Sequence, residues 1–246
     1  IRPGEQYYME IPEGWSSAHD RNLFCAILNK AVYGIPSASQ TAGHALTSKL
    51  SSMGYTPCVH DSKFYVKWLD DHHAIFCIVH ADDALWGTNN NAALKADLDQ
   101  LDTEFCPLTR RENPDIFRGI EIRINEDSSI TLHQAAYLRE LAKIYDLLLQ
   151  RTPDTPGSAS DTKGAEPATP QVTSHKQIHE YMVRQGCLQW AVICSPSCAY
   201  RVNWLARHMR NPQPYHMSEQ LRCMTYMHSI ATKGITFRRN SPLPDV

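Results

Sequence analysis

The sequence predicts an α+β fold, in which a larger part of mixed strands and helices is followed by a smaller helical part. Three observations support this prediction: short alternating runs indicate paired strands, apolar residues three and four apart indicate helices, and only helical spacing remains after a proline-rich stretch. The chain has 246 residues, of which 42% are hydrophobic and 20% are charged. This length and composition suffice for a sizeable core and exclude the disordered and fibrous classes.

The first predicted elements are a helix and two strands. A helix is expected over residues 38–53, where apolar residues recur at helical spacing and Gly54 follows as the stop. Residues 63–69 and 74–79 are expected to form strands around the polar turn 70–73.

Further helices and a hairpin are expected along the rest of the chain. A leucine stripe predicts a helix over 94–105, alternating isoleucines predict a hairpin over 120–132, and a second stripe predicts a helix over 137–148. Three more helical stripes are expected after residue 175. Their leading residues are Ile178, Met182 and Trp190; Val202, Leu205 and Met209; and Met217, Leu221 and Met224.

These elements predict two domains joined by a linker. The α+β part is expected over residues 1–150 and the helical part over 175–239, with a short tail at 240–246. Residues 151–174 combine four prolines with Gly, Ser, Thr and Asp and contain almost no large apolar residue. This stretch is therefore interpreted as a linker or a mobile loop.

Composition also restricts the compartment. The longest apolar run, residues 74–79, is far shorter than the roughly 20 residues of a membrane-spanning helix. Eight cysteines are spread thinly along the chain, which favours reduced thiols and an intracellular, cytoplasmic protein. No secretory leader is visible, and the chain begins at Ile1 rather than Met, so we expect it to be a piece of a longer protein.

The charge is distributed unevenly. The net charge is −2, but residues 184–239 contain eight Lys and Arg against the single acid Glu219. This segment is either a contact surface for phosphates or a solvated basic face. If it contacts a nucleic acid, Arg201, Arg207 and Arg210 should project on a common side.

The sharpest local motif is the sequence His80-Ala81-Asp82-Asp83. An apolar strand runs into two adjacent carboxylates, and apolar residues follow again. Two carboxylates at such a place suit a divalent cation, above all Mg²⁺ carrying a phosphate substrate. The alternative is an ordinary polar hairpin turn.

Several motifs, in one order, resemble the reverse transcriptase of copia-type retrotransposons. The resemblance extends from about residue 7 to about residue 237. The matching segments are Tyr8 to Trp15, Lys30 to Ala38, Gly54 with Tyr55, Asp61, His80 to Asp83, Phe117 to Ile122, Ile130 to Gln134 with Tyr137, Thr152 with Pro153, and Arg207 to Pro212.

This resemblance implies a polymerase palm-type antiparallel sheet with packed helices, followed by a helical thumb- or connection-like extension. It implies template-directed nucleotidyl transfer with two Mg²⁺ ions, or Mn²⁺, held by Asp82 and Asp83. A third catalytic Asp of the family precedes Tyr8, and no Asp lies in residues 1–7. We therefore expect the missing ligand upstream and expect this chain alone to be inactive.

The resemblance also assigns substrate contacts, and the sequence departs from the family at several of them. Gly34, Ser37 and His80 are implied as substrate-binding residues. Ser37 stands where the family commonly has Gln, His80 where it has Tyr, and Ala81 removes β-branched bulk beneath the carboxylates.

The implied partners are an RNA or DNA template-primer, dNTPs and the rest of a polyprotein, with integrase upstream and ribonuclease H downstream. The family implies a cytoplasmic, particle-associated location, and no membrane partner is expected. The alternative is a catalytically inactive, decayed or repurposed element that acts as a structural or nucleic-acid-binding protein.

Overall fold

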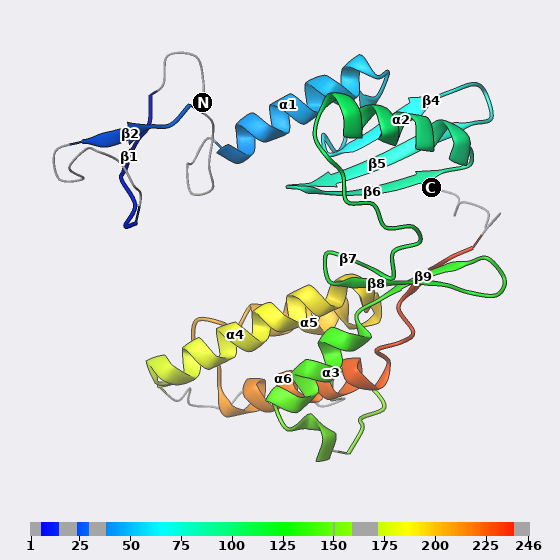
Figure 1. Cartoon of the computed structure of the whole chain (residues 1–246). Helices are drawn as coiled ribbons and strands as arrows, with labels where there is room; N and C mark the ends of the chain where they lie inside the picture. The colour runs from blue at the N-terminus through cyan, green and yellow to red at the C-terminus, as the bar shows by residue number, and fades with distance from the viewer. Residues whose placement is uncertain (1–5, 15–23, 30–37, 150, 159–171, 239–246) are drawn as a thin grey trace. The chain divides into compact units, whose positions relative to one another are not determined.

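The computed structural model divides the chain into two compact units, unit 1 (Ile1–Arg110) and unit 2 (Arg111–Val246) (Figure 1). Each unit is described by itself. The structure describes residues 6–14, 24–29, 38–149, 151–158 and 172–238.

Unit 1 contains a four-stranded antiparallel sheet in the order β3-β4-β5-β6. Two helices accompany this sheet, and a separate two-stranded ladder pairs β1 with β2. The elements are β1 (Tyr8–Glu10), β2 (Cys25–Ile27), α1 (Ala38–Ser52), β3 (Thr56–Pro57), β4 (Phe64–Trp68), β5 (Ala74–His80), β6 (Asp83–Thr88) and α2 (Asn91–Glu104).

The core of unit 1 lies between one face of this sheet and the two helices. Ile75 and Cys77 of β5 are buried together with Leu50 of α1 and Leu101 of α2. Gly54 follows α1 with a φ of 89°, a left-handed conformation that glycine adopts without steric cost and that ends helices. The predicted helix and the two predicted strands of this region are confirmed.

Unit 2 contains a second antiparallel sheet, in the order β10-β9-β8-β7, and a group of helices. Its elements are β7 (Ile116–Phe117), β8 (Ile120–Ile124), β9 (Ile130–His133), α3 (Ala135–Ile144), η1 (Leu147–Leu149), α4 (His175–Ala191), η3 (Val192–Cys194), η4 (Pro196–Cys198), α5 (Ala199–Ala206), α6 (Pro214–Ser229) and β10 (Ile235–Phe237).

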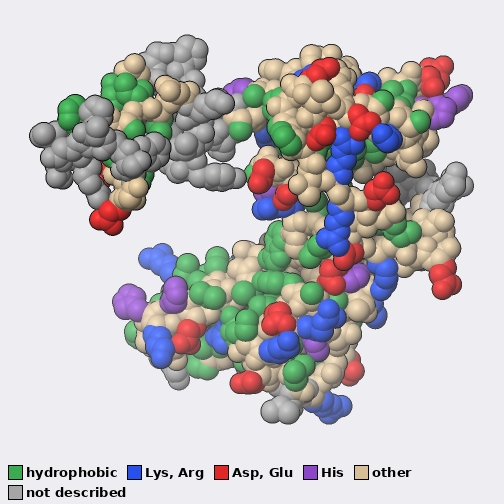
Figure 2. All heavy atoms as spheres, in the orientation of Figure 1, with side chains coloured by type: hydrophobic (Ala, Val, Ile, Leu, Met, Phe, Trp, Pro, Cys, Tyr) green, Lys and Arg blue, Asp and Glu red, His purple; other side chains and the backbone are tan. Residues whose placement is uncertain are grey.

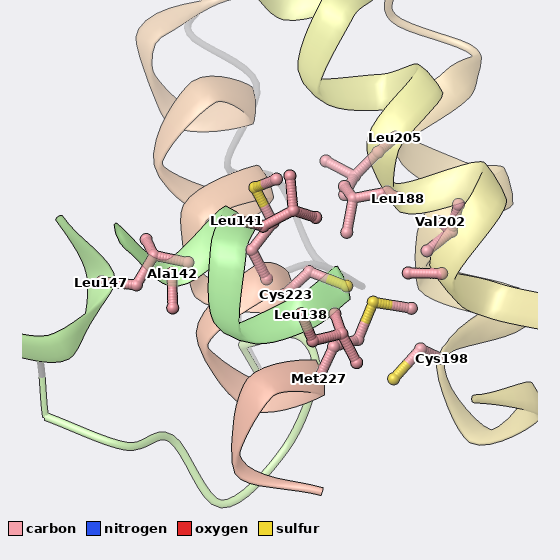
Figure 3. Packing of buried hydrophobic residues seen from close by; sticks show 12 residues of the cluster. Leu138, Leu141, Ala142, Leu147, Leu188, Cys198, Val202, Leu205, Cys223 and Met227 are labelled. Atoms are coloured by element: carbon pink, nitrogen blue, oxygen red, sulfur yellow. The ribbon is translucent and has the colours of Figure 1, made fainter. Parts of the chain in front are cut away.

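The helices of unit 2 share one apolar core (Figure 3). Leu141 of α3, Leu188 of α4, Leu205 of α5 and Met227 of α6 belong to the same buried cluster. Helices from both sides of the proline-rich stretch therefore stabilise one another, because each buries its apolar face on the others.

Most of the α+β prediction is confirmed, including the hairpin of β8 and β9, but one detail is wrong. The region after residue 175 is not entirely helical, because β10 pairs with β9 through partners such as Ile235 and Leu132. The boundary between the compact units lies at Arg110, whereas the sequence places the division within residues 151–174.

The stripe predicted for α4 is also the wrong face. Met182 is 50% exposed and Trp190 37% exposed, whereas Tyr181, Gln185 and Leu188 are buried. Figure 2 shows hydrophobic side chains gathered along this outer side of α4. The fully buried Gln185 interrupts the apolar period, so the core face does not stand out in the sequence.

Candidate active site

The two predicted catalytic carboxylates lie at the connection between β5 and β6. His80 of β5 is paired with Asp83 of β6, so Ala81 and Asp82 alone form the turn. Adjacent antiparallel strands therefore carry Asp82 and Asp83 at their connection.

The alternation of β5 explains why this connection is polar. Ile75, Cys77 and Val79 are buried on the core side, whereas the residues between them are exposed. The strand leaves the core after Val79, and every residue from His80 to Asp83 is exposed. The hairpin therefore carries two adjacent carboxylates from the core out into solvent.

The turn itself has an unusual backbone. Ala81 has a φ of 53°, and Asp82 is not among the described residues with positive φ. A positive φ at the first of two turn residues is typical of type II′ hairpin turns, in which glycine is preferred at that position. A residue with a Cβ atom adopts this conformation at a cost.

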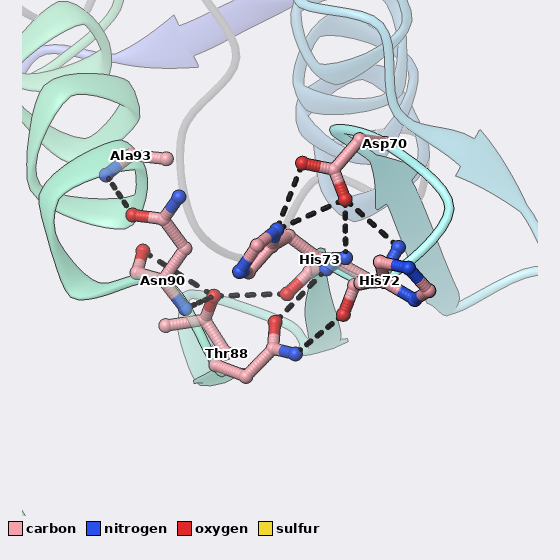
Figure 4. A network of polar contacts seen from close by, with 8 residues as sticks. Asp70, His72, His73, Thr88, Asn90 and Ala93 are labelled. Carbon is pink, nitrogen blue, oxygen red and sulfur yellow. Dashed lines mark hydrogen bonds and ion pairs between the residues drawn. The ribbon is translucent and has the colours of Figure 1, made fainter.

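The opposite end of the hairpin is held by a polar network (Figure 4). The hydroxyl of Thr88 donates to the carbonyl of Ala74, and Asn90 accepts a hydrogen bond from the Ala93 amide at the start of α2. The amides of His72 and His73 donate to Asp70, and the His72 amide is the main reason why the pKa of this carboxyl lies below its usual value. These contacts fix the base of the hairpin.

The body of the hairpin rests on an apolar and aromatic core. Trp86 of β6 is paired with Cys77 of β5, and its ring meets that of Tyr55 edge to face at 5.7 Å between centroids. Burial raises the pKa of the Cys77 thiol to about 12. This cysteine is therefore a neutral packing residue in the core of unit 1.

The exposed carboxylates of Asp82 and Asp83 have the chemistry for a divalent cation, since Mg²⁺ prefers oxygen ligands. Within the residues that the structure describes, no group of three or more His, Cys, Asp or Glu side chains could hold a metal ion. The hairpin thus supplies two candidate ligands, and the described part of the chain supplies no third.

The predicted substrate-binding residues are only partly visible. Gly34 and Ser37 lie outside the described residues. His80 lies directly opposite Asp83 in the β5–β6 register, so the two side chains share one face of the sheet.

Arg201 does not belong to the predicted basic face. Its side chain is buried, with 5% of the residue exposed, and its Nη2 atom lies 2.8 Å from a carboxylate oxygen of Glu219. The guanidinium also stacks 4.7 Å from the ring centre of Trp204. The prediction that Arg201 projects on a common side with Arg207 and Arg210 is wrong, because a buried carboxylate on α6 holds it inside unit 2.

The other two predicted arginines are exposed. Arg207 caps the C-terminal end of α5 and Arg210 lies in the following turn. On the same helix, Val202 and Leu205 are buried, as the predicted apolar face requires.

A cluster of aromatic rings packs around α5, and the sequence analysis did not predict it. The rings of His208 and His216 stack at 3.9 Å, and Trp204 contacts both of them. Tyr200 is 79% exposed on the outer face of the same helix. The sequence signal for this surface is the spacing of Tyr200, Asn203 and Arg207, which are three and four positions apart and therefore lie on one side of a helix.

Comparison with known proteins gives one family. The model of the family described as "Reverse transcriptase (RNA-dependent DNA polymerase)" matches residues 4–158. No solved structure matches the chain. Within the described part of the chain, every helix is too short or too polar to span a bilayer.

Three curated relatives are similar over almost the whole chain. The retrovirus-related Pol polyproteins from transposons RE2 and RE1 of Arabidopsis thaliana are 26% and 25% identical over 244 and 239 residues, and that from transposon TNT 1-94 of Nicotiana tabacum is 23% identical over 245 residues. Each alignment covers 97% of this chain but only 16%, 16% and 18% of the relative. The chain thus spans about a sixth of the length of these polyproteins.

Proposed function

The chain belongs to the reverse transcriptase (RNA-dependent DNA polymerase) family of copia-like retrotransposon polyproteins, and from this premise we propose that it carries part of a two-metal nucleotidyl-transfer site. The observation that carries the proposal is the position of Asp82 and Asp83 at the exposed tip of the β5–β6 hairpin. The palm-type description of the unit 1 sheet belongs to the same proposal.

Asp82 and Asp83 would hold Mg²⁺ or Mn²⁺ through their carboxylate oxygens. When bound, two such ions activate the primer 3′-hydroxyl and neutralise charge on the departing pyrophosphate. Asp82 is the principal ligand in this proposal, and Asp83 completes the pair from the first position of β6.

A third carboxylate would have to come from outside the described residues. Among the described strands, β6 forms an edge of its sheet and pairs only with β5. An additional strand can pair with such an edge through its backbone. A strand bearing an Asp would thereby lie beside Asp83, which supports an upstream segment of the polyprotein as its source.

The proposed substrates are dNTPs and an RNA or DNA template-primer. His80 would contact the substrate from the same face as Asp83, and Gly34 and Ser37 remain proposed contacts from the family resemblance. Arg207 and Arg210 would bind phosphates, because both are exposed and neither makes a described side-chain hydrogen bond or ion pair.

The proposal is tested first by metal binding. Mn²⁺ titrated into the labelled chain should broaden the amide resonances of residues 80–84, and Asp82→Asn should abolish this broadening. Asp71→Asn removes an exposed carboxylate from the other end of β5 and serves as the control. Broadening that is equal in all three proteins would contradict a metal site at the tip.

Primer extension gives the second test. The 246-residue chain should not extend a primed template, whereas a chain lengthened upstream should do so with Mg²⁺ and lose the activity on Asp82→Asn. The exposed Arg207 and Arg210 favour one alternative, a repurposed nucleic-acid-binding protein. Nucleic-acid binding without extension by the lengthened chain would support that alternative.

A further inference from the structure

Helix α5 presents an unusual outer face. Tyr200 is 79% exposed, and Asn203 and Arg207 are exposed at helical spacing from it. Arg207 follows Tyr200 by seven positions, so their directions around the helix differ by only about 20° and their Cα atoms by about 10 Å along the axis. An aromatic ring, an amide and a guanidinium therefore share one side of α5.

These side chains contribute little to the fold. The opposite face of α5 places Val202 and Leu205 in the unit 2 core. Within the described residues, neither Tyr200 nor Arg207 makes a side-chain hydrogen bond, ion pair or ring contact. Both side chains are therefore exposed to solvent.

The segment around this face is strongly basic. No acidic residue lies between Glu180 and Glu219, and Glu219 is itself buried against Arg201. The positive charges of Arg207 and Arg210 are thus uncompensated within their own segment. This charge suits a polyanion.

The neighbouring aromatic group stiffens the face. Trp204 follows Tyr200 by one helical turn, and its ring is packed against Arg201 and His208. Since Arg201 is fixed by its buried ion pair, Trp204 has little freedom to move. The edge-to-face contact of Trp204 with His216 packs α5, which carries Tyr200, against α6.

We propose that this face of α5 binds unpaired nucleotides of a single strand, with a base stacked on Tyr200 and phosphates held by Arg207 and Arg210. An exposed ring can stack on the face of an unpaired base, whereas duplex bases are covered by their neighbours. The inference rests on the proposed function, because it assigns the single-stranded template as the ligand of this surface.

The test compares binding of a labelled single-stranded RNA of about 12 nucleotides with binding of a blunt duplex, by fluorescence anisotropy. Tyr200→Ala should weaken single-strand binding about 5- to 150-fold and leave duplex binding unchanged. Tyr200→Phe, which keeps the ring, should retain the wild-type affinity. Tyr8→Ala removes a tyrosine that is 59% exposed in unit 1 and is the matched control.

Salt dependence tests the phosphate contacts. Arg207→Ala should reduce the slope of log affinity against log salt by about 0.7 for the single strand. Because both substituted side chains lie on the surface, circular dichroism should show an unchanged fold.

The proposal is overturned if wild type does not bind the single strand, if Tyr200→Ala binds it as tightly as wild type, or if both ligands lose affinity equally. Each of these results leaves the metal-binding and extension tests of the hairpin unaffected. Failure of the α5 surface is therefore distinguishable from failure of the polymerase assignment.

Discussion

Ala81 places a Cβ atom where the backbone of the β5–β6 turn has a φ of 53°. The strain lies directly beside Asp82, so the local backbone that presents the carboxylate is not the one that an L-residue prefers. The neighbouring ladder pairs, His80 with Asp83 and Val79 with Ala84, hold the turn in this conformation.

Replacing Ala81 by glycine should stabilise unit 1 by about 0.5–1 kcal/mol, because glycine accepts a positive φ without steric cost. The free energy of unfolding in urea measures the effect. Ala84→Gly, in the adjoining strand, should instead destabilise unit 1 by about 0.5–1 kcal/mol. Glycine relieves no strain there, and it increases the conformational entropy that the unfolded chain loses on folding. An equal loss in both variants would show that Ala81 is not strained.

Single residues also mark the limits of sequence analysis. The Asp82–Asp83 pair was predictable because its neighbours in sequence are its neighbours in the hairpin. The burial of Arg201 was not, because its partner Glu219 lies 18 positions further on, on another helix. An arginine and a glutamate reveal nothing of their pairing until the helices are packed.

Among the elements of unit 1, a buried polar contact joins α2 to β4. The Nζ atom of Lys67 lies 2.8 Å from both oxygens of Asp97, and the hydroxyl of Tyr55 donates to the same carboxylate at 2.6 Å. Asp97 is 7% exposed. Helix α2 is therefore held against the sheet by an ion pair as well as by the packing of its leucines.

Lys67→Met should destabilise unit 1 by about 3 kcal/mol, because the Asp97 carboxylate stays buried without its counter-ion. Lys95→Met breaks the exposed pair with Asp99 on the same helix and should cost less than about 0.5 kcal/mol. Urea unfolding of both variants gives the comparison. Similar losses for the two would mean that the buried pair is no stronger than the surface pair.

Two buried acids, the thiol of Cys77 and the phenol of Tyr55, make unit 1 sensitive to alkali. Burial raises the pKa of Cys77 from its usual 9.0 to about 12, and burial followed by the Asp97 hydrogen bond raises the pKa of Tyr55. A raised pKa in the folded state means that the stability contribution is complete below the unfolded pKa and is lost as the pH rises. Unfolding free energy should therefore fall from about pH 9 upward, by at most about 1.4 kcal/mol per pH unit for each group.

Cys77→Ala should flatten this decline between about pH 9 and pH 11, measured by urea unfolding at several pH values. Cys106→Ala, at an exposed thiol, should leave the slope as it is in wild type. A slope that is identical in all three proteins would exclude the buried thiol as the cause.

The elements differ in how well the sequence predicts them. Helices α1 and α2 and the hairpins emerge from local periodicity, because each has a single buried face. Helix α4 does not, since Gln185 occupies its core face and donates to the Val202 carbonyl. Strand β10 has only three residues, and its pairing depends on β9, about a hundred residues away.

At the scale of the whole chain, elements from both sides of the proline-rich stretch pack together within unit 2. Helix α3 shares a core with α6, and β9 pairs with β10. The segments on either side of residues 159–171 therefore belong to one compact unit. The composition of residues 151–174 shows that this stretch has few apolar residues. It does not show that the segments on either side pack together, because that packing depends on side chains far apart in the sequence.

A protease site inserted between residues 165 and 166 should give two fragments that remain together in size-exclusion chromatography. The expected cause is the buried cluster that joins Leu138 and Leu141 to Met224 and Met227. The uncut chain, and the cut chain in urea, are the two references. Separate elution in buffer would instead support a domain boundary in the stretch itself.

The buried pair of Arg201 and Glu219 has an evolutionary consequence. Gly157 lies so close to the Arg201 guanidinium that a Cβ atom there would overlap it, and the Ser158 amide donates to Glu219. Loss of either charge alone leaves the other buried and lowers the free energy of unfolding by about 3–5 kcal/mol. A related element that replaces the pair one residue at a time would therefore pass through a destabilised protein. Among related elements, positions 201 and 219 should therefore covary, and a residue larger than glycine at 157 should accompany the loss of the arginine.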